Sequence, residues 1–298
     1  MSARTRLLLG AGYLALFLVT FYVALILVFP VDALRRHLAA AVERETPLTL
    51  AIGELRVGWT GDLEARQVTL AWPGPDRSVP VLAADRVEVD IALSPLLFGR
   101  LDADFDGEAY DGRFDGHVEG PLSGGPADRL RLHLDRLDLA RHAGLASAAR
   151  LVATGRLSGD VSVSHRAPGG FRPGRRTGTV RLLAEAGSLR ELPFVASSLP
   201  EVGIERASAS ARIDGDRLEV EEVDVRGPEV ALTAAGHVGL VTPLGESTLN
   251  LTLRVRPERR MPPTVRQMLA AVSRPADASG TFGYLLLGTV ARPEMRPL

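Results

Sequence analysis

The sequence predicts a mainly β protein, in which an N-terminal transmembrane helix is followed by a long antiparallel β-sheet with a few short capping helices. Three observations lead to this fold class. Residues 7–31 carry no charged side chain, apolar and polar residues alternate over much of the remaining chain, and turn-forming pairs such as Asp-Gly separate the alternating segments. We therefore expect a cytoplasmic head at residues 1–6, a transmembrane anchor at 7–31 and a β-rich domain at 32–298.

Residues 7–31 are long enough to cross a bilayer. The 25 residues from Leu7 to Val31 would form a helix of about 37 Å, against about 30 Å for the hydrocarbon core. A cleaved signal peptide is the alternative, but its apolar stretch is shorter, and the nearest small-x-small site, Ala39 to Ala41, lies beyond Arg35 and Arg36. Because the short head is expected to stay in the cytoplasm, we predict a single-pass inner-membrane protein with residues 32–298 in the periplasm. The lipid bilayer is then its first partner.

The remaining chain is predicted to be short helices and many strands. Asp32 is expected to cap an amphipathic helix at residues 33–44, which Pro47 ends. Beyond Leu48 the apolar period changes to that of strands, and we expect roughly ten to twelve of them. The clearest alternating segments are 87–91, 129–135, 218–220, 223–226 and 249–256, and looser ones lie at 63–70, 157–163 and 179–185. A phase shift after Asp135 predicts a bulge. Further helices are expected at 139–152, 192–199 and 262–273, and turns at Asp111-Gly112, Asp115-Gly116 and Gly227-Pro228.

The composition excludes several functional classes. The 298 residues include 35 basic and 36 acidic side chains, and a net charge of −1 provides no basic field for nucleic acid. All the basic residues are arginines and cysteine is absent, which excludes lysine Schiff bases, disulfides, thiol nucleophiles and cysteine-bound metals. We expect no cofactor and no nucleic-acid partner.

No motif predicts catalysis. Residues 102–107 copy the first half of a calcium-binding loop, but Arg113 stands where the loop needs a glutamate, so a polar strand face is the preferred interpretation. The six histidines are expected to be scattered and exposed to solvent, and no GxSxG motif provides a hydrolase nucleophile. Arg172, Arg175 and Arg176 are expected in a solvated Gly/Pro-rich loop, with an anionic headgroup or an acidic partner as the alternative. We predict no catalytic residues, no metal ligands and no enzymatic activity.

The alternation of apolar residues leaves two architectures open. Amphipathic strands can close as a sandwich or curl into a half-open trough with an aliphatic lining, and the residues alone favour the sandwich. In a trough, an acyl chain buried against the lining would contribute about 0.8 kcal/mol per CH₂. The candidate lining residues are Val87, Val89, Ile91, Leu130, Leu132, Leu134, Leu249, Leu251, Leu253 and Val255.

Several segments together resemble a known family. They are the anchor with its amphipathic helix, residues 53–59 as a first strand, a strand-to-helix step at 92–99, a Gly-rich hairpin at 107–120 and a closing strand at 282–293. Their order is similar to that of the delta-proteobacterial type II secretion system protein N family, which in turn is similar to AsmA-like envelope proteins. The resemblance covers nearly the whole chain.

This resemblance favours the trough over the sandwich. It implies a long, curved antiparallel sheet, an AsmA-like half-open trough. It also implies a non-enzymatic inner-membrane component of type II protein secretion, with other secretion-system or envelope proteins as partners. The alternative that it implies is lipid binding or transfer in envelope biogenesis, with phospholipid acyl chains in the aliphatic groove.

Overall fold

The computed structural model describes most of the chain beyond residue 47. The described ranges are 48–58, 62–72, 78–122, 127–142, 152–166, 175–190, 202–241, 244–261, 280–290 and 292–298, with residues 32, 35, 36, 39, 40, 43, 263, 266 and 267. The predicted head and anchor, residues 1–31, and the predicted helix at 192–199 lie outside these residues. Among the described residues, no helix combines the length and the apolar character needed to cross a membrane.

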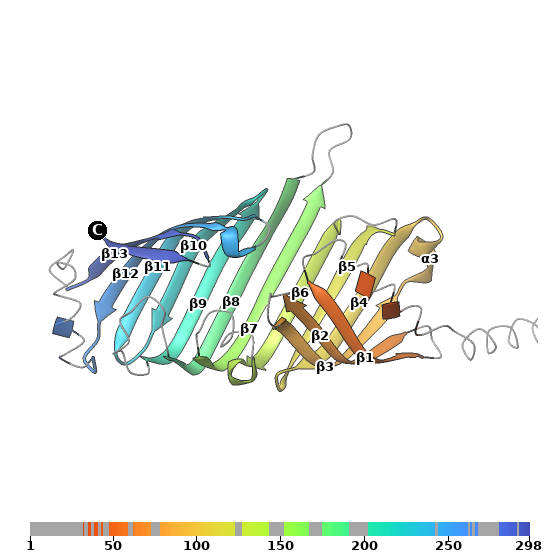
Figure 1. Ribbon diagram of the computed structural model, residues 1–298, viewed down its shortest axis with the longest axis horizontal. Helices are drawn as coiled ribbons and strands as arrows, with labels where there is room; N and C mark the ends of the chain where they lie inside the picture. The colour runs from red at the N-terminus through yellow and green to blue at the C-terminus, as the bar shows by residue number, and fades with distance from the viewer. Residues whose placement is uncertain are drawn as a thin grey trace, which may run out of the picture.

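Fourteen strands form one antiparallel sheet in which each strand pairs with its neighbours in the sequence. The strands are β1 (Thr49–Val57), β2 (Leu63–Trp72), β3 (Val79–Ile91), β4 (Arg100–Ala109), β5 (Gly112–Pro121), β6 (Arg129–Asp138), β7 (Val152–Arg166), β8 (Arg175–Arg190), β9 (Val202–Asp214), β10 (Arg217–Arg226), β11 (Val230–Gly239), β12 (Thr248–Pro257), β13 (Phe282–Gly288) and β14 (Pro293–Pro297). Figure 1 shows them side by side along the long axis. The mainly β prediction is confirmed, and all described strands belong to one sheet rather than to the two sheets of a sandwich.

The alternating sequence explains why one face of the sheet is apolar. In β6, Leu130, Leu132 and Leu134 pair with Val163, Val161 and Gly159 of β7, so apolar residues meet apolar or glycine partners on the same face. The predicted bulge is confirmed, since the register shifts between Leu134 and Leu137. A second shift lies between Val220 and Val223 in β10. Each bulge restores the apolar positions to the same face after an extra residue.

Short helices occupy a few connections. α3 (Leu93–Leu96) follows β3 where the strand-to-helix step was expected, and the 3₁₀ turns η1 (Leu139–Arg141) and η2 (Leu244–Glu246) follow β6 and β11. The prediction of a helix over 139–152 is wrong at its end, because Val152 begins β7, and residues 143–151 lie outside the described part. The described residues within 32–43 and 263–267 are helical, as predicted.

The predicted turn at Asp115-Gly116 is wrong. Both residues lie inside β5, where Gly116 pairs with Phe105 of β4. The Phe105 ring occupies the space that a β-carbon at 116 would need. The glycine therefore makes room for a ring rather than for a chain reversal, and the reversal occurs at Tyr110 and Asp111, which both have positive φ.

The N-terminal end of the sheet curls over its own apolar face. Ala84, Ala109, Tyr110, Phe114 and Leu137 form a buried cluster. Side chains from β2 and β3 and from β6 and β7 pack against this cluster; they include Val68, Leu82, Leu132 and Leu157. In Figure 1, β1–β3 are correspondingly drawn across β4–β6. The apolar face is therefore on the inside of the curl.

Candidate functional site

All ten predicted lining residues lie on the apolar face of the sheet. Val89, Leu132 and Leu251 belong to one row of register partners that crosses β3–β12. Val87, Leu134 and Leu253 define a second row, and Ile91, Leu130 and Leu249 a third, with Val255 beside the second row on β12. The residues between them in these rows are apolar side chains or glycines. At about 4.8 Å per strand, the rows extend for about 43 Å.

The exposure of these side chains shows that the face is not covered like a protein core. All ten are half-buried, because neighbours in the sheet cover their sides. A second layer packed over them would leave them buried, as it does the core residues of a sandwich. Within the described part of the chain, the buried apolar side chains are divided between the curl near Phe114 and positions farther along the sheet, among them Ala234, Val238, Phe282 and Tyr284.

The central part of the apolar face is aliphatic, and aromatic rings stand at its two ends. Phe105 and Phe114 lie on β4 and β5, and Phe282 and Tyr284 lie on β13. The rows between them are built from Leu, Val, Ile, Ala and Gly. Such a surface has no hydrogen-bonding side chains to offer, so the contacts that it can make are apolar.

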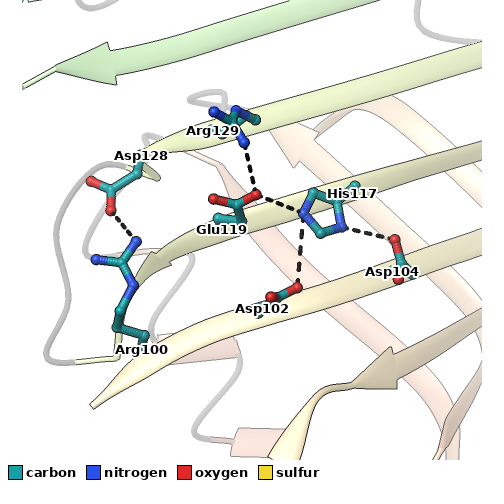
Figure 2. A network of polar contacts seen from close by, with 7 residues as sticks. All are labelled: Arg100, Asp102, Asp104, His117, Glu119, Asp128 and Arg129. Atoms are coloured by element: carbon teal, nitrogen blue, oxygen red, sulfur yellow. Dashed lines mark hydrogen bonds and ion pairs between the residues drawn. The ribbon is translucent and has the colours of Figure 1, made fainter. Parts of the chain in front are cut away.

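The opposite face carries a polar network around His117 of β5 (Figure 2). His117 Nδ1 lies 2.8 Å from Asp104 Oδ1, and its Nε2 lies 3.1 Å from Glu119 Oε1. Asp102 Oδ1 is 3.8 Å from the same Nε2. Arg129 of β6 donates to Glu119 across 3.0 Å. Three carboxylates therefore meet around a single imidazole, and an arginine pairs with one of them.

The network shifts the proton affinities of its members. Hydrogen bonds to Asp104 and then to Glu119 raise the pKa of His117 above its ordinary value. The same contact with His117, helped by Arg129, lowers the pKa of Glu119. Both shifts favour the charged pair, so the network acts as a set of ion pairs on the surface of the sheet. No group of three or more His, Asp or Glu in the described ranges is arranged to hold a metal ion.

Sequence reasoning missed this network. The histidines were expected to be scattered and exposed, but His117 meets three carboxylates and His133 lies 2.8 Å from Asp160. Part of the network comes from the segment that resembles a calcium-binding loop, because Asp102, Asp104 and Asp106 lie along one face of β4 rather than in a loop. The sequence did contain one signal, since residues i and i+2 of a strand share a face, as His117 and Glu119 do.

The arginine cluster is also placed differently from the prediction. Arg175 and Arg176 begin β8, so they do not belong to a loop, and Arg172 lies outside the described residues. Arg175 is held by two hydrogen bonds to the carboxylate of Asp214 on β9. The hydroxyl groups of Ser164 and Thr177 join the same stretch of the polar face, 3.0 Å apart.

The chain matches no protein-family model, no curated protein and no solved structure.

Proposed function

We propose that this protein binds the acyl chains of phospholipids on the apolar face of its sheet, as a non-enzymatic, AsmA-like half-open trough in the cell envelope. One observation carries the proposal: three parallel rows of apolar side chains and glycines cross ten consecutive strands, and all ten candidate lining residues are half-buried. An apolar face of this extent that stays open to solvent marks an interaction surface.

The energetic gain from an acyl chain is large enough for useful affinity. Each buried CH₂ contributes about 0.8 kcal/mol, so a ten-carbon stretch supplies several kcal/mol after the cost of ordering the chain. In the middle of the face, Ala209, Ala211 and Gly159 have small side chains or none, so the surface is shallower there. Larger leucine and valine side chains lie beside them on the neighbouring strands. The ligand would lie along the rows, across the strands.

The location in the cell follows from the predicted anchor. A helix at residues 7–31 would hold the protein in the inner membrane, with the head in the cytoplasm and the sheet in the periplasm. The sheet would then be close to the bilayer that supplies its lipid.

Two residues on opposite faces of the sheet allow a direct test. Val161 of β7 lies in the central apolar row, whereas Ser210 of β9 lies on the polar face between Arg181 and Glu222. The full chain is purified in a mild detergent, and bound phospholipid is measured by native mass spectrometry and by extraction. We expect wild type and Ser210→Asp to retain phospholipid, and Val161→Asp to lose most of it.

Circular dichroism of each variant checks that the sheet persists. Absence of phospholipid from the wild-type protein, or equal retention by the two aspartate variants, would contradict the proposal. A Val161→Thr variant keeps the shape without a charge, and it should show an intermediate loss if Val161→Asp proves unstable.

A role in type II protein secretion is the second candidate. It is supported by the resemblance, and by α3 and the β4–β5 hairpin lying at the expected places in the chain. Deleting the gene and measuring secreted enzymes in the medium tests it, and unchanged export would overturn it. Complementation with Val161→Asp then shows whether export depends on the apolar face.

A further inference from the structure

Among the described residues, the large apolar side chains that are exposed in the connections between strands lie at one rim of the sheet. Because the strands alternate in direction, the connections after β3, β5, β11 and β13 all lie on the same rim, which carries α3 in Figure 1. Among the described residues, the large apolar side chains exposed in connections are Leu97, Phe98, Leu122, Val241 and Val290. All five belong to this rim. The opposite rim carries Tyr110 and Met261, which are buried.

Three of these side chains form what we call the docking corner: Leu97, Phe98 and Leu122. Leu97 and Phe98 are 85% and 82% exposed, and Leu122 is 55% exposed. Hydrogen bonds fix the backbone beneath them, since Phe98 N donates to Pro95 O at 3.0 Å and Leu122 N donates to Gly99 O at 2.9 Å. The corner is therefore a formed structure that holds apolar tips in solvent, an arrangement that usually marks a contact surface.

A cationic hollow lies directly beside the docking corner. It encloses about 680 Å³ on the polar face, and Arg100, which follows Gly99 in the chain, lines it. Its other lining residues are Glu119, Asp128, Arg129, Arg131, Ser162, Ser164, His165, Arg175 and Thr177. Four guanidinium groups thus share one hollow with two carboxylates.

The pairing of these arginines leaves positive charge available. Arg100 pairs with Asp128 at 2.8 Å, Arg129 with Glu119 at 3.0 Å, and Arg175 with Asp214. Arg131 contacts no carboxylate in the described ranges. The Arg131 guanidinium therefore offers the hollow unused donors for an anion.

We propose that the docking corner binds the surface of an anionic phospholipid bilayer, with Leu97, Phe98 and Leu122 entering the interface and the hollow beside them receiving a headgroup phosphate. Apolar tips next to arginines are the combination that binds peripheral proteins to anionic bilayers. The tips lie in turns at the ends of strands rather than on the flat face of a strand, which suits a deformable lipid interface better than a shaped protein surface. The inference is independent of acyl-chain binding by the apolar face, which lies across the strands rather than at their ends.

The absence of cysteine makes a site-specific test possible. Phe98→Cys is labelled with the fluorophore NBD in the full chain, which is held in phosphatidylcholine nanodiscs. Leu298→Cys, labelled in the same way, is the control, because Leu298 is 65% exposed but follows β14 at the opposite rim. Vesicles of phosphatidylcholine, with or without phosphatidylglycerol, are then added, and brominated lipids report the depth of the label.

We expect the label at 98 to brighten severalfold and shift to the blue with phosphatidylglycerol vesicles, and to be quenched by brominated lipid. The label at 298 should not respond. Arg131→Gln and Arg100→Gln should each weaken vesicle binding about fivefold, and high salt should weaken it further. Leu97→Ser should weaken it without changing the phospholipid retained by the apolar face.

Three results would overturn the proposal. One is a label at 98 that stays in water with every vesicle. Another is equal binding to vesicles with and without phosphatidylglycerol. The third is a label that responds only when another protein is present, because the corner is then a protein contact and the bilayer assignment is wrong. Loss of phospholipid by Val161→Asp with unchanged vesicle binding would show that the two lipid contacts are separate.

Discussion

Gly107 on β4 and Phe114 on β5 are register partners, and the Phe114 ring lies over the Gly107 backbone. A β-carbon at 107 would come within 2.6 Å of Phe114 Cζ. The reverse arrangement occurs two residues along, where Phe105 of β4 covers Gly116 of β5. The two rings consequently pack with their centroids 6.4 Å apart. Each ring fills space that only a glycine leaves free.

Substitution of this glycine is expected to destabilise the protein. Gly107→Ala forces its methyl group against the Phe114 ring and the Arg86 carbonyl, and we expect a loss of about 1–3 kcal/mol in the free energy of unfolding. Urea denaturation followed by circular dichroism measures it. Gly283→Ala in β13 is the control, because its methyl group would meet only the side chain of Leu298, at 3.1 Å. Equal losses for the two variants would show that the ring contact is unimportant.

Two buried tyrosines should respond oppositely to removal of their hydroxyl groups. Tyr110 Oη accepts a hydrogen bond from Ala83 N at 2.8 Å, so Tyr110→Phe leaves a donor unpaired and should cost about 1–3 kcal/mol. Tyr284 is 2% exposed and its hydroxyl has no partner among the described residues, so Tyr284→Phe should be neutral or stabilising. Thermal or urea unfolding compares the two variants. A marked loss for Tyr284→Phe would mean that its hydroxyl has a partner.

The bulge in β6 should be stabilised by glycine. Arg136 has a φ of 56°, a conformation that costs an L-residue about 1–2 kcal/mol and glycine almost nothing. Arg136 N still donates to Ser158 Oγ after substitution, because that contact is made by the backbone. We expect Arg136→Gly to unfold at the same or a higher urea concentration, and Arg136→Val to unfold at a lower one. A lower midpoint for the glycine variant would argue against strain at this bulge.

The His117 network predicts a stability that falls in mildly alkaline solution. The pKa of His117 is raised in the folded state, so its contribution is complete below about pH 6.5, the usual unfolded value, and is lost as the pH rises through the folded pKa. Asp160 raises the pKa of His133 in the same direction. Urea midpoints measured between about pH 6 and 9 should therefore decline.

Asp104→Asn separates the two histidines. It removes the largest cause of the His117 shift, so the NMR titration of His117 should move to lower pH, while that of His133 stays in place. Asp106→Asn, two residues along the same face of β4, is the control. An unmoved His117 titration in Asp104→Asn would contradict the pairing seen in Figure 2.

The sequence could predict what depends on neighbours in the chain. The strict alternation of Leu130, Leu132 and Leu134 identified a strand and its apolar face, and the phase shift after Asp135 identified the bulge. Nothing local could distinguish one long sheet from a sandwich, because both place the same residues inward. That difference depends on how strands far apart in the chain lie relative to one another.

The polar network was missed for a related reason. His117 and Asp104 are 13 residues apart, and they meet only because the turn at Tyr110 and Asp111 sets the register of β4 and β5. A shift of one residue would place His117 opposite another partner and on the wrong face. At Asp115-Gly116 the sequence predicted a turn that does not exist. An Asp-Gly pair can lie in a turn, but it can also lie inside a strand where the glycine sits beneath an aromatic ring.

The strictly sequential order of the strands makes the length of this sheet adjustable. Each strand depends on only its two neighbours in the chain, as do the units of a repeat protein. Inserting or deleting one hairpin would change the span by about 10 Å, with the same face still apolar and the same rim still carrying the turns that follow odd strands. Evolution could thus match such a protein to the width of the space it works in by copying hairpins, without redesigning its interior.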